Sequence, residues 1–326
     1  MALIEAENLS KTFRVYRRGE GIRGYLKSFL SRKYEEVEAV TDLDLEIEEG
    51  EMIGYIGANG AGKSTTVKML TGILEPSSGR IEVDGRNPQK ERKENAMNIG
   101  VVFGQKTQLW WDLPVRDSFQ LLKEIYEVED GAYECRVDEF NEVLDLDEFW
   151  EQPVRKLSLG QKMRAELAAA FLHHPKIVYL DEPTIGLDVA VKEKIRDFIR
   201  KMNRDKDITV MLTTHDLDDI EDLCERIVVL DSGEKIYDGK LESLVDRFTS
   251  RRLVLDLRGE PSFSLELDGI QEVEQDGSHV EITFDREVLS ASDLMREVLE
   301  GFDVADFRIK EPDIESVVKK IYNEGL

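Results

Sequence analysis

A glycine-rich loop between an apolar run and an apolar-periodic stretch limits the folds open to this chain. The loop follows residues 52–56, precedes a stretch that ends near Gly72, and consists of Gly57, Ala58, Asn59, Gly60, Ala61, Gly62, Lys63, Ser64 and Thr65. This order predicts strand, loop and helix in an α/β fold. The glycines let backbone N–H groups point inward, and the helix N-terminus adds its positive dipole end. The loop is expected to cradle phosphate, with Lys63 along the β- and γ-phosphates and Ser64 on Mg²⁺.

Composition favours a globular protein with an acidic surface. The 326 residues suffice for one large or two ordinary domains, and 41% of them are hydrophobic, enough for a core. There are 69 acidic and 44 basic residues, for a net charge of −25. Because nucleic-acid binding depends on Lys and Arg that neutralise phosphates, no nucleic-acid partner is predicted.

The sequence also indicates a compartment and a redox state. No apolar run approaches the roughly 18 residues of a spanning helix, and the N-terminus lacks the basic start and apolar core of a secretion signal. We therefore expect a cytoplasmic chain. Cys135 and Cys224 lie far apart in helical-looking stretches, so both are expected to be reduced packing residues rather than parts of a disulfide or metal site.

A basic insertion interrupts the N-terminal strands, which are expected near residues 2–8 and 43–47. Residues 17–33 hold six Lys and Arg against the single acid Glu20, and their apolar side chains recur at helical spacing. The insertion is either a solvated loop or a surface that lies against a membrane protein or anionic lipid.

The rest of the chain alternates helices and strands. Residues 111–174 have a helical pattern, and the apolar runs 177–180 and 208–212 are separated by a charged helix, 191–203. This alternation is typical of a buried parallel sheet with crossover helices. A hairpin is expected over residues 227–237.

Beyond about residue 246 the pattern changes to alternating strands, at residues 253–257 and 280–284, followed by two helices. A second, small α+β domain is predicted. Ser290 is expected to cap the first of these helices and Pro312 to start the second.

Two carboxylates follow an apolar strand about 120 residues after Lys63. Asp181 and Glu182 should lie at the carboxyl edge of the sheet, where open α/β sheets bind ligands. Side chains alternate in a strand, so the two acids are expected to differ in role, Asp181 holding Mg²⁺ and Glu182 polarising the attacking water. Adjacent acids are also common on solvated surfaces, but the preceding apolar run and the following Pro183 favour a site.

Two further side chains end strands at the same predicted edge. His215 follows residues 208–214 and could donate to the γ-phosphate, although a lone His is more often structural. Gln105 ends residues 99–104, and its neutral amide could contact Mg²⁺ and the water.

A helix start provides a second candidate anion site. Residues 157–161 precede an Ala-rich helix that stops before Pro175. Ser158 and Gln161 have the spacing of a capping box, and the same helix start offers free N–H groups, a hydroxyl and Gly160.

Taken in this order, the motifs resemble those of the nucleotide-binding subunit of ATP-binding cassette (ABC) transporters over about residues 3–244. The resemblance implies ATP and Mg²⁺ as ligands and ATP hydrolysis as the activity. It makes residues 57–65 the phosphate loop, Gln105 the Q-loop glutamine, Ser158, Leu159, Gly160 and Gln161 the signature, Asp181 the Walker B acid, Glu182 the catalytic base, Asp188 the D-loop aspartate and His215 the switch histidine.

The same resemblance implies an organisation and partners. Residues 1–244 would be a nucleotide-binding domain of P-loop type, with an antiparallel β subdomain and a helical subdomain at about 106–176; residues 245–326 would be the accessory α+β domain. Each ATP would lie between the phosphate loop of one subunit and the signature and Asp188 of another, in a homodimer or heterodimer. The dimer would drive a separate membrane permease, placing the chain on the inner face of the cell membrane.

Several features indicate which group of ABC ATPases the chain resembles most. The segment 108–114 and Leu159, where the family usually has glycine, look like ATPases of ABC-2 type exporters of the drug and viologen efflux group, and the C-terminal domain resembles their appendage. The N-terminal insertion is more like that of polysaccharide-export ATPases, which rank second. A non-transport cassette ATPase is the alternative from another class, but such proteins carry a long coiled coil or two cassettes.

Aromatic side chains complete the expectations. In the family an aromatic before the phosphate loop stacks on adenine, and Phe13 matches that position, with Tyr16 as a competitor and core burial as an equal alternative. Trp110 and Trp111 lie in the segment that links the core to the helical subdomain. Two successive tryptophans cannot easily point the same way, so at least one is expected to dock on the permease.

Overall fold

The computed structural model describes residues 2–16, 34–104, 106–214, 216–247, 250–259, 262–265, 267–310 and 317. The chain forms two compact units, Met1–Asp238 and Gly239–Leu326. The sequence places the domain boundary after residue 244, whereas these units divide after Asp238, inside strand β9 (Glu234–Lys240).

A six-stranded sheet forms the centre of the first unit, with the strand order β5-β6-β7-β3-β8-β9. Its members besides β9 are β5 (Ile99–Phe103), β6 (Ile177–Asp181), β7 (Thr209–Thr213), β3 (Met52–Gly57) and β8 (Arg226–Asp231). The first five run parallel. Strand β7 is buried throughout, as expected for a parallel sheet covered on both faces. The predicted α/β fold with a parallel sheet is confirmed.

A three-stranded antiparallel sheet lies beside it, in the order β2-β1-β4, with β1 (Ala2–Tyr16), β2 (Tyr34–Glu48) and β4 (Ser78–Val83). The first two strands have 15 residues each, far longer than the short segments predicted. Their distal part pairs Thr12 with Glu38 and continues to the pair of Tyr16 and Tyr34. Side chains of β2 are exposed there, so no apolar alternation marked the extension in the sequence.

The core of the first unit lies between the two sheets. It joins Ile4 and Leu43 of the antiparallel sheet to Ile53 and Tyr179 of the parallel sheet. Helix α2 (Lys63–Leu70), which begins at the glycine-rich loop, packs Val67 into the same cluster. The phosphate-loop helix is therefore held from both sheets.

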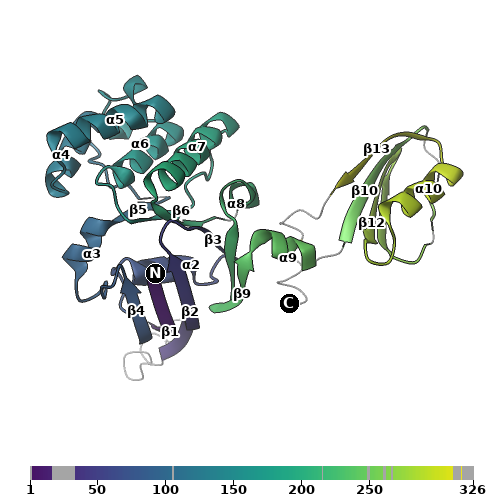
Figure 1. Ribbon diagram of the computed structural model, residues 1–326, viewed down its shortest axis with the longest axis horizontal. Coiled ribbons are helices and arrows are strands. Elements are labelled where there is room, and N and C mark those ends of the chain that lie inside the picture. Colours follow the sequence, from purple (N-terminus) through teal and green to yellow (C-terminus); the bar gives the residue numbers. More distant parts are fainter. Residues whose placement is uncertain are drawn as a thin grey trace, which may run out of the picture. The chain divides into compact units, whose positions relative to one another are not determined.

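Helices occupy the other side of the parallel sheet from the antiparallel sheet (Figure 1). They are α4 (Val115–Ile125), α5 (Asp130–Leu144), α6 (Leu159–Phe171) and α7 (Val189–Lys206), with the short 3₁₀ turns η1 (Leu146–Glu148) and η2 (Val154–Lys156); α3 (Arg92–Asn98) and α8 (Leu217–Leu223) complete the unit. Phe198 of α7 makes edge-to-face contacts with Phe140 of α5 and Phe171 of α6, with 5.2 Å between ring centroids in each pair.

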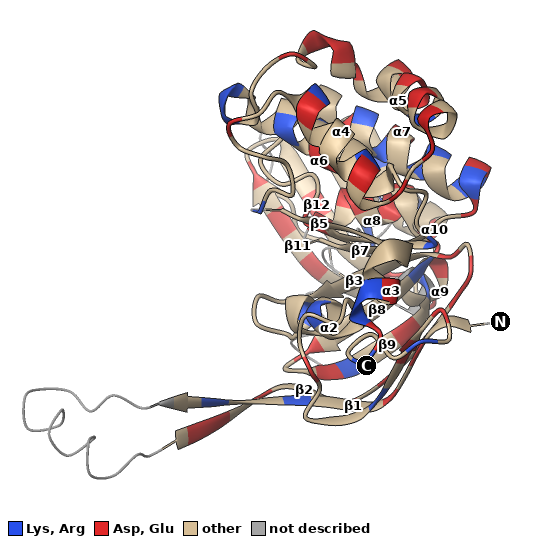
Figure 2. Cartoon of the chain, turned by 90° about the vertical axis from the view of Figure 1, so that its left-hand side faces the viewer, with Lys and Arg blue, Asp and Glu red and all other residues tan. Residues whose placement is uncertain are grey.

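Charge complementarity supports this aromatic centre. Acidic residues are spaced along α5, and basic residues are spaced along α7 (Figure 2). Lys201 and Lys206 both pair with Glu139, at 3.5 and 3.0 Å. Cys224 is buried as predicted, but the prediction for Cys135 is wrong, because that residue lies on an exposed position of α5.

The second unit contains α9 (Leu241–Arg247) and a four-stranded antiparallel sheet in the order β11-β12-β10-β13. The strands are β10 (Ser250–Leu257), β11 (Ile270–Asp276), β12 (His279–Asp285) and β13 (Val304–Lys310), and α10 (Ala291–Gly301) packs Leu294 and Val298 on Leu255 and Ile282. Ser290 caps α10, as predicted, by accepting a hydrogen bond from Asp293 N at 3.1 Å. The helix expected to start at Pro312 lies outside the described residues.

Candidate nucleotide site

The carboxyl ends of four parallel strands bring the predicted site residues to one edge. Phe103, Asp181 and Thr213 are register partners at the ends of β5, β6 and β7, and β3, which pairs with β7, ends at Gly57. Parallel strands place their C-terminal residues on one side, which explains why residues far apart in sequence meet here.

The glycine-rich loop has the backbone geometry of an anion cradle. Gly60 and Gly62 adopt φ values of 90° and 104°, in the left-handed region open mainly to glycine. A Cβ on Gly62 would lie 2.4 Å from the carbonyl oxygen of Ala39, so this position excludes a side chain. Helix α2 starts at the next residue, so its free N–H groups face the loop.

Lys63 lies inside this loop and is largely buried. Its ammonium donates to the carbonyl oxygens of Gly57 and Ala58. Burial lowers the pKa of Lys63, while the nearby charges of Glu182 and Asp181 oppose that shift. A desolvated ammonium at the base of the loop is suited to pair with phosphate oxygens.

Asp181 connects the loop to the central strands. Its Oδ2 accepts from Ser64 Oγ at 3.3 Å, and its Oδ1 accepts from Thr213 Oγ1 at 2.5 Å. Hydroxyl and carboxylate oxygens are ligands that Mg²⁺ prefers, with water and phosphate oxygens filling its remaining positions. The donor set of Ser64 and Asp181 therefore fits Mg²⁺.

Glu182 is held in an unusual backbone conformation beside Asp181. Its φ is 59°, in the left-handed region that non-glycine residues rarely adopt, and its N–H donates to the carbonyl oxygen of Thr213 at 2.8 Å. Backbone strain of this kind is concentrated at functional sites.

A cavity of about 690 Å³ joins these groups. Its lining includes eight residues of the glycine-rich loop and the start of α2, together with Asp181 and Glu182. Gly104, Lys106 and Ile185 also line it, and the sequence had not singled them out. This volume lies within the range of small-molecule and cofactor pockets.

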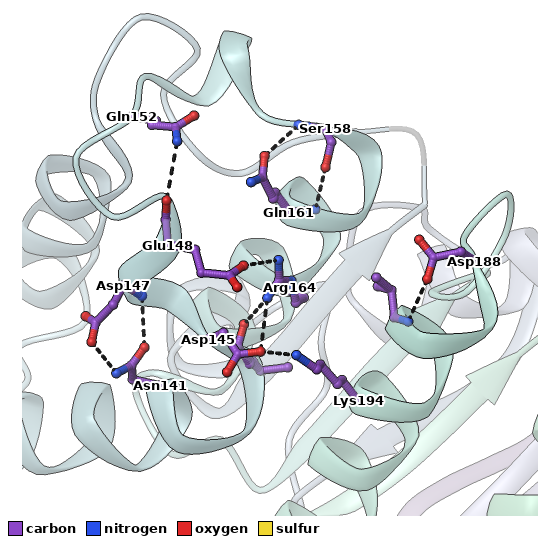
Figure 3. Close-up of polar contacts among 12 residues, drawn as sticks. Asn141, Asp145, Asp147, Glu148, Gln152, Ser158, Gln161, Arg164, Asp188 and Lys194 are labelled. Atoms are coloured by element: carbon purple, nitrogen blue, oxygen red, sulfur yellow. Dashed lines mark hydrogen bonds and ion pairs between the residues drawn. The ribbon is translucent and has the colours of Figure 1, made fainter.

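The candidate residues expected to act in trans are grouped around the start of α6 (Figure 3). Ser158 and Gln161 form the predicted capping box, with Ser158 N to Gln161 Oε1 at 3.0 Å and Gln161 N to Ser158 Oγ at 3.2 Å. Gly160 lies close to Val191, where an added Cβ would come within 3.3 Å of a methyl group. Leu159 is 50% exposed and reaches toward Gly186.

Asp188 begins the neighbouring helix in the same way. Its carboxylate accepts from Val191 N at 3.0 Å and caps α7 (Figure 3). Neither this residue nor Ser158, Leu159, Gly160 and Gln161 lines the 690 Å³ cavity. Within one copy of the chain, these residues form a second group, separate from the phosphate loop.

Asp145 links α6 and α7, because it pairs with one basic side chain from each helix. Arg164, six residues after Ser158, and Lys194, six residues after Asp188, both pair with its carboxylate (Figure 3). Asp145 has φ 46°, a left-handed conformation that Asp tolerates better than most residues. The two helix starts are thereby held at a common level.

Several predicted residues are not placed. Gln105 and His215 lie outside the described residues, as does the insertion at 17–33. Phe13 is exposed on β1 with Lys11 Nζ 5.4 Å from its ring centroid, so core burial of Phe13 is not observed; the side chain of Tyr16 is not described.

Thr213 is a functional candidate that the sequence reasoning missed. Its hydroxyl holds Asp181 from the adjacent strand, and the side chain is fully buried. The available signal was its position next to Thr214 and His215 at the end of an apolar run, which places it level with Asp181 in a parallel sheet.

Comparison with known proteins gives a consistent result. Residues 40–185 match the family model described as ABC transporter. The ABC transporter ATP-binding protein NatA of Bacillus subtilis is 34% identical over 68% of this chain and 92% of its own length. The daunorubicin resistance ATP-binding protein DrrA3 of Streptomyces coeruleorubidus is 31% identical over 88% of this chain and 92% of its own length.

Solved structures agree with the sequence relatives. The dimeric cassette MJ0796, in a post-hydrolysis state bound to ADP and Pi, is 28% identical, with a TM-score of 0.61, over 73% of this chain and 98% of that chain. Among the described residues, none of the helices combines the length and hydropathy needed to span a bilayer. The phosphate cradle, the paired acids at the sheet edge and these relatives lead to one conclusion: the chain belongs to the ABC transporter family, as an ATP-binding and ATP-hydrolysing subunit.

Proposed function

We propose that this chain is the ATPase subunit of an ABC-2 type exporter that forms a dimer over two ATP molecules and drives a separate membrane permease. The carrying observation is the contact of Ser64 and Thr213 with Asp181, which sets a metal-binding carboxylate and Glu182 at the mouth of the phosphate cradle. This arrangement supports hydrolysis rather than nucleotide binding alone.

The chemistry follows from the positions of the side chains. The loop N–H groups and Lys63 bind the β- and γ-phosphates. Ser64 and Asp181 would hold Mg²⁺, which supplies positive charge to the phosphate oxygens. Glu182 accepts a proton from the attacking water, in a loose transition state for which positioning and electrostatics provide most of the rate. Gln105 and His215 are assigned the water- and γ-phosphate-contacting roles on sequence alone.

Export is favoured by the relatives that carry resistance names. The alignment with DrrA3 covers 88% of the chain, more than the 238 residues of the first unit, so it extends into the second unit. The bacitracin transport protein BcrA of Bacillus licheniformis is 32% identical over 67% of the chain. We infer a cytoplasmic subunit attached to the membrane through its permease.

An exposed apolar surface is available for the permease. Trp110 and Trp111 are 38% and 54% exposed, and Leu121 and Ile125 of α4 are also exposed. Leu121 and Ile125 lie at helical spacing and would have been buried if α4 only covered its own core. Large exposed aromatic side chains are enriched at protein interfaces.

The dimer is tested with Glu182→Gln. Removing the proton acceptor should abolish turnover while ATP and Mg²⁺ still bind, so the variant should elute as a dimer in gel filtration with ATP and as a monomer without it. Glu94→Gln, an exposed change on α3, serves as the control and should keep wild-type turnover. A Glu182→Gln protein that stays monomeric with ATP and Mg²⁺ would contradict the proposal.

The permease contact is tested by changing each tryptophan to Ala in turn. One variant should retain ATPase activity as an isolated subunit and lose co-purification with the permease. If both variants assemble and transport normally, the docking assignment of Trp110 and Trp111 is wrong.

The basic insertion provides a separate membrane test. Clustered Lys and Arg near an anionic surface each add roughly 1 kcal/mol of attraction. Replacing Arg23, Lys27, Arg32 and Lys33 with Gln should reduce recovery of the complex with membranes. Equal recovery across a salt series would leave the insertion as a solvated loop.

A further inference from the structure

Glu166 is a buried carboxylate that the proposed hydrolysis does not use. It lies on α6, the signature helix, and is 3% exposed between the apolar neighbours Ala165 and Leu167. An ionised group in such surroundings is costly unless its oxygens are hydrogen-bonded. A helix that only packed on the core would be better served by an apolar residue here.

The hydrogen bonds that the Glu166 side chain accepts lead to one segment, which starts two residues after Gln105, and a further bond joins that segment to the Glu166 carbonyl oxygen. Its Oε1 accepts from Thr107 Oγ1, its Oε2 accepts from Gln108 N at 3.1 Å, and its carbonyl oxygen accepts from Gln108 Nε2 at 3.0 Å. Burial raises the pKa of Glu166, and the bonds from Thr107 and Gln108 oppose that shift. The carboxylate thus supplies the partners that this irregular segment lacks.

A second residue of α6 holds the same segment. Lys162 lies one turn before Glu166, and its ammonium is 5.6 Å from the ring centroid of Trp111. Ser158, Lys162 and Glu166 are spaced four residues apart, so they follow one face of the helix. Residues 107–111 therefore lie along the face that leads to Ser158, about two turns and ~12 Å from Glu166.

The other end of the segment is fastened to the nucleotide site. Gly104 N donates to the carbonyl oxygen of Asp181 at 2.9 Å, and Lys106 N donates to that of Phe103 at 2.8 Å. From Gly104 to Thr107 the chain can span at most ~11 Å. A short tether thus connects the backbone of Asp181 to the side chain of Glu166.

We propose that Glu166 is a positioning residue that fastens the chain following Gln105 to the signature helix, so that nucleotide binding at the phosphate loop and presentation of Ser158 to a second subunit change together. The inference depends on the proposed function, because it requires Ser158 to act on the nucleotide of the other copy. The coupling runs from Asp181 to Gly104, along the chain to Thr107 and Gln108, and from these to Glu166 and α6.

The test compares two measurements in the Glu182→Gln background: the affinity of the monomer for a fluorescent ATP analogue, and the ATP concentration that gives half-maximal dimer in analytical ultracentrifugation. Glu166→Ala and Thr107→Val should raise the ATP concentration for half-maximal dimer by about 10-fold, within the usual range of coupling between sites. Both should change monomer affinity by less than about 3-fold, a small part of that range.

Two further variants separate positioning from helix stability. Glu166→Gln keeps the shape and can accept from Gln108 N while donating to Thr107 Oγ1, so it should restore near-normal dimerisation. Ala168→Gly weakens α6 without removing a hydrogen bond to residues 107–108 and should leave the half-maximal ATP concentration unchanged.

The outcomes distinguish the two hypotheses. If the parent Glu182→Gln protein does not dimerise with ATP, the proposed composite site is wrong. If it dimerises and folded Thr107→Val and Glu166→Ala variants do so at the parent ATP concentration, or if Ala168→Gly shifts the midpoint equally, the positioning role of Glu166 is wrong.

Discussion

Asp181 has contacts on two sides of the nucleotide site, from Ser64 on the loop and Thr213 on β7. Its carboxylate therefore has a defined orientation before any metal ion is considered. Lys63 is placed by a different principle, because it donates to loop carbonyl oxygens and is largely buried. Asp181 is thus held in place for its proposed role as a metal ligand, and Lys63 for its proposed role as a phosphate ligand.

Lys63→Ala should weaken ATP binding by roughly 10- to 100-fold, since a hydrogen bond to a charged group contributes about 1.5–3 kcal/mol. Isothermal titration calorimetry with ATP measures the change. Lys93→Ala, an exposed change on α3, is the control and should bind ATP normally. A Lys63→Ala protein with wild-type affinity would show that the lysine does not touch the phosphates.

Arg164 is a buried side chain that stabilises the helical part of the first unit. It donates to the carbonyl oxygen of Leu144 at 2.8 Å and to Glu148 at 2.9 Å, and it lies 4.9 Å from the ring centroid of Phe149. Arg164→Met keeps the volume but leaves these acceptors unpaired, so unfolding in urea should show a loss of about 2 kcal/mol. Arg204→Met, on an exposed part of α7, should unfold like the wild type.

At the scale of elements, the start of α6 serves both as a helix cap and as a candidate anion site. Ser158 and Ser290 cap their helices in the same way, by accepting from the N–H three residues on at 3.2 and 3.1 Å. The two serines therefore form a matched pair, and the second lies in the other unit of the chain.

Ser158→Ala and Ser290→Ala should each cost about 1 kcal/mol of stability in the unit that contains the cap. Only Ser158→Ala should also lower ATPase activity, because only that hydroxyl is proposed to meet a phosphate. Paired denaturation and activity measurements decide the point. Equal retention of activity in both variants would leave Ser158 as a cap alone.

The β8–β9 hairpin is held by ion pairs that depend on pH. Asp238 pairs with Arg226 at 2.9 Å and with Lys235 at 3.0 Å. Burial raises the pKa of Asp238, but the hydrogen bonds from Arg226 and Lys235 outweigh it and hold the pKa below its usual value. Its stabilisation is therefore present above the unfolded pKa of about 3.9 and is lost as the pH falls through the lower folded pKa.

Asp238→Asn should consequently be less stable than the wild type at pH 7, and the difference should shrink as the pH is lowered toward 3. Urea midpoints across this range provide the measurement. A difference that stays constant with pH would mean that the charge of Asp238 does not stabilise the hairpin.

The sequence predicted those elements whose burial leaves a pattern. Strands β6 and β7 are apolar runs because both faces of their sheet are covered, one by helices and the other by the core shared with the antiparallel sheet. The phosphate loop could be recognised because glycine is required at Gly62. The long end of β2 was missed because residues 34–38 are exposed and show no apolar alternation, and the end of β1 is its pairing partner. Thr213 and Glu166 were missed because their roles arise from contacts with residues 32 and 59 positions away, which local spacing does not reveal.

At the scale of the whole molecule, one copy holds the phosphate loop and the signature in two separate groups. The capped starts of α6 and α7 have structural explanations within one copy. The proposed function requires a second copy to bring the two groups together over ATP, so dimer formation, rather than any single residue, is its decisive test.

Three apolar side chains near the helix starts remain exposed in one copy: Leu159 at 50%, Ile185 at 40% and Val189 at 77%. If a second copy covers them, mass action links the thermal stability of this protein to its own abundance. The melting temperature of Glu182→Gln should then rise with protein concentration when ATP is present and stay constant without it. If the melting temperature in the presence of ATP does not change with protein concentration, this face remains exposed to solvent. If this face is covered in the dimer, a low cellular concentration of the subunit would by itself keep the ATPase inactive. A dilute subunit would stay monomeric even at saturating ATP.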